Sequence, residues 1–394
     1  TTEIYTYTES SAASDVYKRQ IHKCRAWYCQ ECGKCSAVCP ITRWETRCYS
    51  SPRLLVEKAI DSRPEEIMQD PLFWSCLTCK RCSSLCPSDV YFSDFIQKAR
   101  TLARGCGQTG ECTHGAVIQN WGKMMTDPKL KQHRRDWVTP GLHISDDSEI
   151  VYFTGCLPYY DALFKHLDIE GVEIARAAVK ILNQLGIAPQ VMADERCCGH
   201  DQLWEGEIEA FHALAKLNLE CLKATGASVI ITTCPECALM LAREYPMRIK
   251  DHGMTVFHLS QYLAQAVADG NFVLTPKNNS AVTYHDPCRL GRYLNIYDEP
   301  RSLLAALGLD LREMDRVRSA SLCCGTTGWT SCGQVSKNIQ IERLQEASRT
   351  GVDRMITACI KCQIHFRCAQ EDPQLENKLN LKIQDLTTLI ANHL

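Results

Sequence analysis

Ten cysteines in the second half of this chain form one pattern twice, and this duplication limits the fold more than any other feature of the sequence. The first copy consists of Cys156, Cys197, Cys198, Cys234 and Cys237. The second copy consists of Cys288, Cys323, Cys324, Cys359 and Cys362. In both copies a glycine follows the adjacent cysteines, giving a Cys-Cys-Gly (CCG) triplet, and two residues separate the last two cysteines. Four thiolates suffice for a cubane iron–sulfur cluster, so five thiols predict a more open metal cluster in each copy.

The cysteine content also indicates a compartment. The chain has 25 cysteines among 394 residues, and 45% of its residues are hydrophobic, which is enough for a packed core. Disulfide scaffolds are small secreted domains, whereas these cysteines lie in C-x-x-C groups between amphipathic helical patterns, which favours metal binding. Metal-bound thiolates imply a reducing compartment, and we expect the cytoplasm or the cytoplasmic face of a membrane.

Charge and hydropathy exclude other classes of protein. The formal net charge of −2 gives no reason to expect nucleic acid or an anionic membrane as the main partner. No apolar run approaches the roughly 18 residues of a membrane-spanning helix, and no signal-peptide core stands at the start.

The chain divides into five segments. The first is rich in Thr, Ser and Tyr and is interpreted as a disordered or artefactual N-terminus without a functional role. The second is dense in cysteine, the third is a polar connector, and the last two each contain one copy of the duplicated pattern. We expect the basic run 129–135 of the connector to be a solvated helix face. The predicted segments are 1–20 (N-terminus), 21–105 (cysteine-dense domain), 106–148 (connector), 149–275 (first CCG domain) and 276–394 (second CCG domain).

Strand and helix patterns alternate in both copies, which predicts α/β layers with a mostly parallel sheet. Strands are expected at 150–153, 189–192, 229–232, 281–284 and 354–357. Helices are expected at 172–185, 207–223, 300–307 and 335–348, and in the cysteine-dense segment at 52–60 and 91–102. Ligands of such sheets gather beyond the carboxyl ends of the strands, where the cysteines of both copies fall. Two similar lobes related by a pseudo-twofold axis would place their clusters facing each other.

Two further cysteine runs precede the duplicated pattern. Each has the spacing C-x-x-C-x-x-C-x-x-x-C-P of bacterial ferredoxins, in which the fourth cysteine ligates the other cluster. One predicted [4Fe–4S] cubane is therefore held by Cys29, Cys32, Cys35 and Cys86. The other is held by Cys76, Cys79, Cys82 and Cys39. Zinc is the alternative metal, but zinc sites need only four ligands in paired knuckles, and two matched runs followed by proline favour iron–sulfur clusters.

This combination of two ferredoxin runs and two complete CCG motifs resembles the catalytic subunit of heterodisulfide reductase, in the form where a ferredoxin-like part and a double CCG part are fused. The resemblance covers residues 21–394. It implies an α-helical ferredoxin-like domain followed by a duplicated α/β CCG domain, with a noncubane [4Fe–4S] cluster at each CCG motif. All ten cysteines of the duplicated pattern match the family's ligand positions.

The resemblance implies an iron–sulfur oxidoreductase subunit. Electrons would pass through two cubanes to the two noncubane clusters, which reduce, or reversibly form, a disulfide of small thiols. The alternative is an electron-transfer subunit of another complex, of the benzoyl-CoA reductase, sulfate-respiration or glycolate and glycerol-3-phosphate oxidation type. A third alternative is a metal-bound scaffold without catalysis, which two intact ligand sets disfavour. Because the chain has no G-x-G-x-x-G dinucleotide fingerprint, we expect a flavin-containing or cytochrome-type partner subunit in a hetero-oligomeric complex.

Other residues near the motifs have less defined roles. His200 could give a proton to a departing thiolate, but a hydrogen bond to cluster sulfur or backbone is the preferred interpretation. Arg289 and Arg292 could meet a substrate carboxylate or phosphate, although we favour a surface salt bridge. Seven cysteines fit no ligand position, and the one at position 221 is expected in the core. They are Cys24, Cys48, Cys106, Cys112, Cys221, Cys332 and Cys368.

Overall fold

The computed structural model describes residues 22–46, 49–276, 280–372 and 381–394. The segment 1–20 and Cys48, on which predictions were made, lie outside the described residues. The chain forms two compact units. Unit 1 contains the residues up to Val117 together with the segments Asp201–Ile208 and Thr326–Ser336. Unit 2 contains Ile118–His200, Glu209–Gly325 and Lys337–Leu394.

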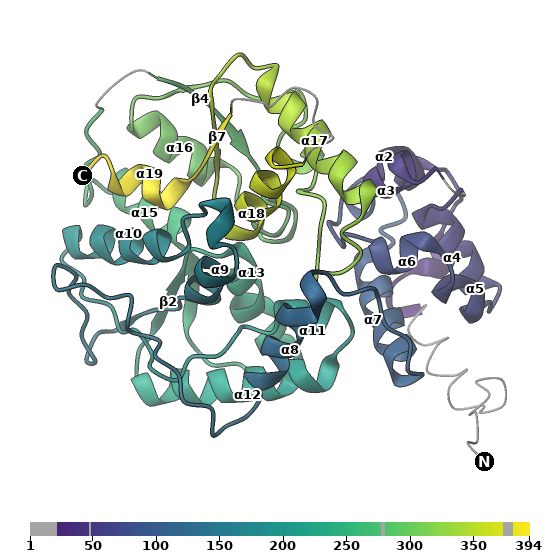
Figure 1. Cartoon of the computed structure of the whole chain (residues 1–394), viewed down its shortest axis with the longest axis horizontal. Helices are drawn as coiled ribbons and strands as arrows, with labels where there is room; N and C mark the ends of the chain where they lie inside the picture. Colours follow the sequence, from purple (N-terminus) through teal and green to yellow (C-terminus); the bar gives the residue numbers. More distant parts are fainter. Residues whose placement is uncertain (1–21, 47–48, 277–279, 373–380) are drawn as a thin grey trace. The chain divides into compact units, whose positions relative to one another are not determined.

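Unit 1 is built from short helices around the ferredoxin runs (Figure 1). Its α-helices are α2 (Lys34–Val38), α3 (Pro40–Trp44), α4 (Pro52–Ile60), α5 (Pro64–Met68), α6 (Pro71–Ser75) and α7 (Phe92–Gly105). Its 3₁₀ turns are η1 (Ala26–Tyr28), η2 (Ser83–Leu85) and η3 (His114–Ala116). Helices α3 to α6 each begin with a proline, whose fixed φ suits the first turn and whose missing N–H is not needed there. The predicted helix 52–60 is confirmed, and α7 extends the predicted 91–102 by one turn.

Unit 2 contains two parallel sheets. The first has the order β1-β2-β3, and the second has the order β5-β4-β6-β7. The strands are β1 (Ile150–Tyr152), β2 (Val229–Thr232), β3 (Thr255–His258), β4 (Ala281–His285), β5 (Asp310–Leu311), β6 (Arg354–Thr357) and β7 (Lys382–Asp385). The central strands β2 and β6 are the predicted 229–232 and 354–357, and their apolar runs are buried. Register pairs such as Val151 with Ile230 and Tyr284 with Ile356 align the strand ends within each sheet.

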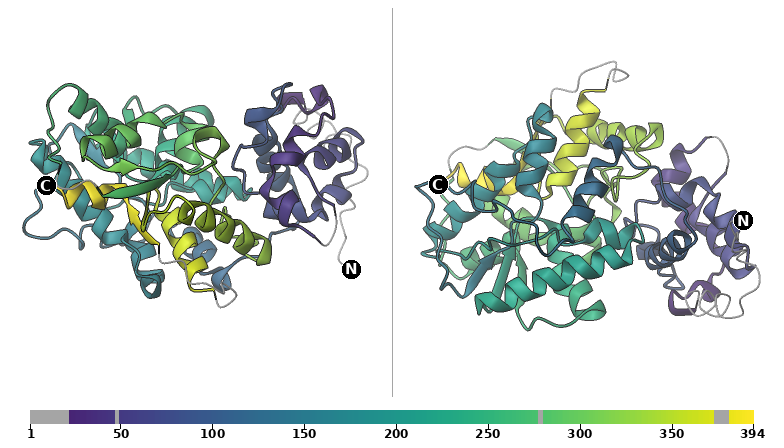
Figure 2. Two further views of the ribbon diagram at one scale, coloured as in Figure 1. Left: turned by 90° about the horizontal axis from the view of Figure 1, so that it is seen from above. Right: turned by 60° about the horizontal axis from the view of Figure 1, so that its bottom comes forward.

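Helices lie on both sides of the strands (Figure 2). The longer α-helices are α8 (Val117–Met124), α9 (Leu157–Leu163), α10 (Gly171–Gln184), α12 (Ile208–Thr225), α15 (Leu259–Ala268), α16 (Asp298–Ala306), α17 (Gln334–Ser348), α18 (Ile360–Gln370) and α19 (Leu386–Ala391). The shorter ones are α13 (Pro235–Leu239) and α14 (Tyr245–Arg248), whereas α11 (His200–Trp204) belongs to unit 1 from Asp201 on. Two π-helical turns, η5 (Met240–Glu244) and η6 (Arg289–Tyr293), and two 3₁₀ turns, η4 (Lys165–Leu167) and η7 (Arg318–Ala320), complete the unit. No helix in the described ranges has both the length and the apolar character needed to cross a membrane.

The predicted fold class is confirmed: a helical ferredoxin-like part precedes a duplicated α/β part. Two details differ from expectation. The strand predicted at 189–192 reduces to one bridge between Val151 and Gln190. The basic run 129–135 contains no helix, and Arg134 is buried because it forms an ion pair with Glu195, so the prediction of a solvated helix face was wrong.

Candidate metal centres

The first ferredoxin set lies together in unit 1. The thiol of Cys29 interacts electrostatically with those of Cys32 and Cys86, and Cys35 interacts with Cys29 and Cys86. Burial raises the pKa of the Cys29 and Cys35 thiols. The structure therefore brings the fourth cysteine of the second run to the first three of the first run, which is the exchange expected of a two-cluster ferredoxin.

The second ferredoxin set surrounds a cavity. The cavity has an empty volume of about 370 Å³ and is lined by Cys39, Cys76, Cys79 and Cys82. Burial raises the pKa of Cys76 to about 12 and that of Cys39 to about 11. Such thiols stay protonated near neutral pH unless a metal displaces the proton. Four thiols that line one partly open pocket fit a metal cluster of the predicted kind.

The two ferredoxin sets differ in exposure. Cys32 of the first set is exposed, whereas Cys76 and Cys79 of the second set are buried. The first set is therefore the one closer to solvent.

A buried arginine that the sequence did not single out supports the second set. The Arg100 side chain is fully buried and donates hydrogen bonds to the carbonyl oxygens of Phe73, Trp74 and Cys76 at 2.6–3.2 Å. It also pairs with the Glu205 carboxylate at 3.0 Å. Arg100 thereby fixes the end of α6, from which the chain enters the ligand run at Cys76. Arg100 lies 27 residues after Phe73, so no local sequence pattern connected the two residues or identified this role.

The five thiols of the first CCG motif meet in unit 2. Cys156 follows β1, Cys234 follows β2, and Cys237 lies in the first turn of α13. The thiols of Cys156 and Cys198 both hydrogen bond with that of Cys197, and Cys198 and Cys234 hydrogen bond with Cys237. These contacts and burial hold the pKa values of Cys156, Cys198 and Cys237 well above the ordinary value.

The five thiols of the second CCG motif meet in the same way. Cys288 follows β4, Cys359 follows β6, and Cys362 lies in the first turn of α18. The thiol of Cys288 hydrogen bonds with that of Cys323, Cys324 with those of Cys323 and Cys362, and Cys362 with that of Cys359. A turn at positive φ follows each pair of adjacent cysteines, with φ of 78° at Gly199 and 89° at Gly325.

The spacing of the thiols argues against single zinc ions. Four sulfurs around a tetrahedral zinc ion lie roughly 3.8 Å apart, because each Zn–S bond is about 2.3 Å long. Within the described part of the chain, no three cysteine sulfurs lie within 4.8 Å of one another. No disulfide joins the cysteines of the described ranges either. The described thiols are thus neither paired as disulfides nor drawn together in threes as around a single zinc ion.

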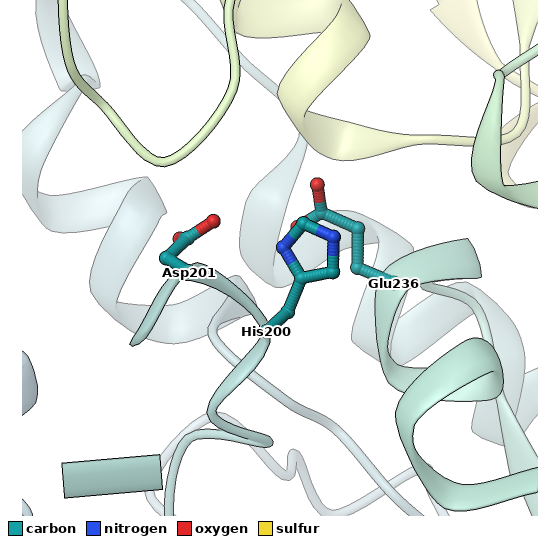
Figure 3. A group of neighbouring side chains, drawn as sticks. All are labelled: His200, Asp201 and Glu236. Carbon is teal, nitrogen blue, oxygen red and sulfur yellow. The ribbon is translucent and has the colours of Figure 1, made fainter. Parts of the chain in front are cut away.

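The two CCG motifs face each other. The thiol of Cys359 in the second motif interacts electrostatically with that of Cys234 in the first. One residue of each C-x-x-C segment joins them: Lys361 Nζ lies 2.8 Å from Glu236 Oε2. The His200 Nδ1 atom lies 3.4 Å from the Glu236 carboxylate, and Figure 3 shows the imidazole beside this carboxylate. The facing arrangement thus includes a buried polar cluster of His200, Glu236, Arg289 and Lys361.

Three side chains near the motifs correct the sequence-based expectations. Arg289 and Arg292 are 3% and 8% exposed, so the preference for a surface salt bridge was wrong. Arg289 Nε donates to His200 Nε2 at 2.8 Å, and Arg292 donates to the carbonyl oxygens of Ser319 and Ser321. His200 contacts the side chains of Arg289 and Glu236, and its hydrogen bond to cluster sulfur or backbone stays a prediction. Cys221 on α12 is only half-buried and does not belong to the core.

Comparison with known protein families agrees with this geometry. Residues 150–242 and 282–367 each match the cysteine-rich domain family CCG, and residues 14–90 match a 4Fe–4S dicluster domain family. The chain thus contains a ferredoxin-type dicluster domain followed by two CCG domains.

Individual relatives share similarity with this chain over half of its length or more. A subunit of the dihydromethanophenazine:CoB–CoM heterodisulfide reductase of Methanosarcina mazei is 28% identical over 70% of this chain and 69% of the relative. A subunit of the fumarate reductase (CoM/CoB) of Methanothermobacter marburgensis is 27% identical over 91% of this chain and 71% of the relative. The EtfAB:quinone oxidoreductase of Syntrophomonas wolfei is 30% identical over 50% of this chain but only 27% of the relative.

One solved structure shares the fold. A hypothetical protein from Helicobacter pylori superimposes with a TM-score of 0.56 over 97% of this chain and 76% of that chain, at 12% identity. The dicluster domain, the two CCG domains and these relatives make the chain similar to the catalytic subunit of heterodisulfide reductase. The chain is an electron-transfer protein or oxidoreductase related to the heterodisulfide reductase and fumarate reductase of these methanogens.

Proposed function

We propose that the chain holds two cubane and two noncubane [4Fe–4S] clusters and passes electrons from the cubanes to the CCG pair, where a disulfide of small thiols is reduced or formed. The proposed cubane ligands are Cys29, Cys32, Cys35 and Cys86 for one cluster, and Cys39, Cys76, Cys79 and Cys82 for the other. The proposed noncubane ligands are Cys156, Cys197, Cys198, Cys234 and Cys237 for one cluster, and Cys288, Cys323, Cys324, Cys359 and Cys362 for the other.

The facing of the two CCG motifs is the observation that carries this proposal. Disulfide reduction consumes two electrons and two protons and releases two thiols, and a wire of clusters delivers the electrons one at a time. Two metal centres on either side of one bond avoid the release of a free thiyl radical, because each sulfur has its own centre. The interaction of Cys234 with Cys359 supports this arrangement.

Clusters bound at both motifs would supply the electrons and Lewis-acid stabilisation of the sulfurs. The protein's own side chains set the polarity between the motifs. Glu236 and Lys361 form a largely buried ion pair, and Arg289 donates to His200, so charged and hydrogen-bonding groups lie between the two motifs. Such groups orient polar substrate atoms and keep exchangeable protons near the departing sulfurs.

The electrons must come from another subunit. The heterodisulfide reductase and EtfAB:quinone oxidoreductase relatives favour a hetero-oligomeric complex in which a flavin-containing or cytochrome-type partner reduces the cubanes. We place this complex in the cytoplasm or at the cytoplasmic face of a membrane, because clusters held by 18 reduced cysteines require a reducing compartment.

A second function has one observation in its favour. The residues that join the motifs are largely buried, with side-chain exposures of 5% for Lys361 and 13% for Glu236. A closed polar contact between the two motifs suits an electron-transfer subunit, in which the clusters pass electrons on to a reaction in another subunit and bind no disulfide themselves. The two functions make different predictions for the purified protein.

Anaerobic protein should reduce a mixed disulfide of small thiols with a reduced viologen dye as electron donor. The variant Cys198→Ser should lower turnover more than about tenfold and remove one paramagnetic signal. It removes a proposed cluster ligand whose thiol contacts those of Cys197 and Cys237. The matched control is Cys221→Ser, since this half-buried cysteine lies outside every ligand set.

Turnover that survives Cys198→Ser unchanged would refute the disulfide chemistry at the CCG pair. An inactive wild-type protein whose clusters nevertheless accept electrons from the dye would establish the relay function in its place.

A further inference from the structure

The two CCG motifs occupy equivalent places but differ in the charges that surround them. One residue after the first cysteine, the first copy has Leu157 and the second has Arg289. Four residues after that cysteine, the first copy has Tyr160 and the second has Arg292. The duplicated chain therefore has apolar or aromatic side chains at one motif where it has cations at the other.

The C-x-x-C segments differ in the same direction. The third position is Glu236 in the first copy and Lys361 in the second. Three residues after the last cysteine, the first copy has Met240 and the second has His365. At all four of these positions the basic side chain belongs to the second copy.

Three of these four basic side chains lie close to the thiols of the second motif, whereas Lys361 pairs with Glu236 of the first copy. Arg289 and Arg292 are both buried and both act electrostatically on Cys288. His365 Nδ1 lies 3.4 Å from the Cys324 sulfur.

The local backbone also differs between the copies. The first cysteine is followed by the α-helix α9 in the first copy and by the π-helical turn η6 in the second. The turn η6 contains both Arg289 and Arg292, and π-helical turns frequently occur at functional sites. The arginines of the second copy are therefore part of a distinct local structure.

The first motif has fewer basic side chains nearby, and one of them is paired with a carboxylate. Arg134 acts on Cys156, but it forms a buried ion pair with Glu195. Arg196 precedes Cys197, and its guanidinium donates to the Leu130 carbonyl oxygen at 3.0 Å.

We propose that the CCG centre of the second copy has a higher reduction potential than that of the first, and that Arg289 and Arg292 set this order. The inference rests on the proposed function, because it requires a cluster at each motif. Nearby cations and hydrogen bonds to ligand sulfurs stabilise the reduced, more negative state of an iron–sulfur cluster. Buried charges act strongly because solvent screens them little. When the pair holds one electron, that electron resides on the second centre.

The test is an anaerobic potentiometric titration followed by electron paramagnetic resonance. The variants Cys198→Ser and Cys324→Ser each remove one noncubane signal and so assign the two signals to the two copies. The wild-type protein should show the second-copy signal appearing at the higher potential. In Arg292→Gln this signal should shift to lower potential, while the first-copy and cubane signals stay in place.

Two further variants separate charge from structure. Arg292→Lys retains the charge and should restore most of the wild-type potential. His365→Met introduces the residue that the first copy has at this position, and it should shift the same signal to lower potential through loss of the contact with Cys324.

Equal potentials, a reversed order, or a shift of all centres together in Arg292→Gln would overturn the inference while leaving four clusters in place. Absence of both noncubane signals from the wild-type protein would overturn the proposed function and the inference with it.

Discussion

The glycine that follows each pair of adjacent cysteines shows how single residues shape the CCG sites. Gly199 has φ of +78°, and a Cβ atom built there would lie 2.9 Å from Phe211 Cδ2 on α12. Only glycine adopts this backbone conformation without strain. Only glycine also leaves room for Phe211, because it has no Cβ atom. The same conformation recurs at Gly325, with φ of 89°.

The variant Gly199→Ala should destabilise the protein more than the matched control Gly226→Ala. Both positions have positive φ, which costs an L-residue about 1–2 kcal/mol, but Gly226 has nothing within 4 Å of an added Cβ. The contact with Phe211 should add about 1–3 kcal/mol. Anaerobic thermal unfolding measures the difference, and equal unfolding temperatures for the two variants would contradict this account of Gly199.

The spacing of the cysteines allowed their grouping to be predicted from the sequence, whereas the burial of charged residues could not be predicted. The repeated C-x-x-C and CCG spacings predicted which thiols would meet, and the structure brings them together in those sets. The burial of Arg292 depends on the carbonyl oxygens of Ser319 and Ser321, and that of Arg134 on Glu195. These partners lie 27 residues or more away in the sequence, so no local pattern revealed them.

At the scale of elements, central strands were more predictable than edge strands. The apolar runs of β2 and β6 predicted both strands at their observed bounds. Of the edge strands, β1 was predicted, whereas β3, β5 and β7 were missed; β5 has only two residues and β7 has the sequence Lys-Ile-Gln-Asp. Polar residues at sheet edges hide strands from methods that depend on apolar runs.

The junction between β7 and α19 gives a pH-dependent prediction. Burial and the nearby Glu170 raise the pKa of Asp385, which caps α19, to about 7. A raised folded-state pKa contributes stability at low pH that is lost as pH rises from about 4 through 7. Asp385→Asn preserves the cap but removes the ionisation, so relative to wild type it should gain about 2–4 kcal/mol between pH 5 and pH 8.

Unfolding temperatures at pH 5 and pH 8, compared with those of wild type, measure this gain. The exposed Asp251→Asn should show no such gain. A constant difference between Asp385→Asn and wild type at the two pH values would contradict the raised pKa.

At the scale of the whole molecule, the ferredoxin sets and the CCG sets belong to different compact units. The sequence suggested consecutive domains, but the segments that follow the two CCG triplets, Asp201–Ile208 and Thr326–Ser336, both belong to unit 1. Inside unit 1 the Glu205 carboxylate pairs with Arg100, and a Cβ atom at Gly328 would lie 2.2 Å from this carboxylate. Such close packing between distant segments leaves no signal in local sequence patterns.

The central claim is that each chain holds two cubane and two noncubane clusters. Its most direct test is the iron and acid-labile sulfide content of anaerobically purified full-length protein, with Mössbauer spectroscopy to distinguish the cluster types. The account predicts about sixteen irons per chain in four clusters, and a selective loss of about four irons in the variant with all five cysteines of the second CCG motif changed to serine. About eight irons per chain, all in cubanes, would contradict it.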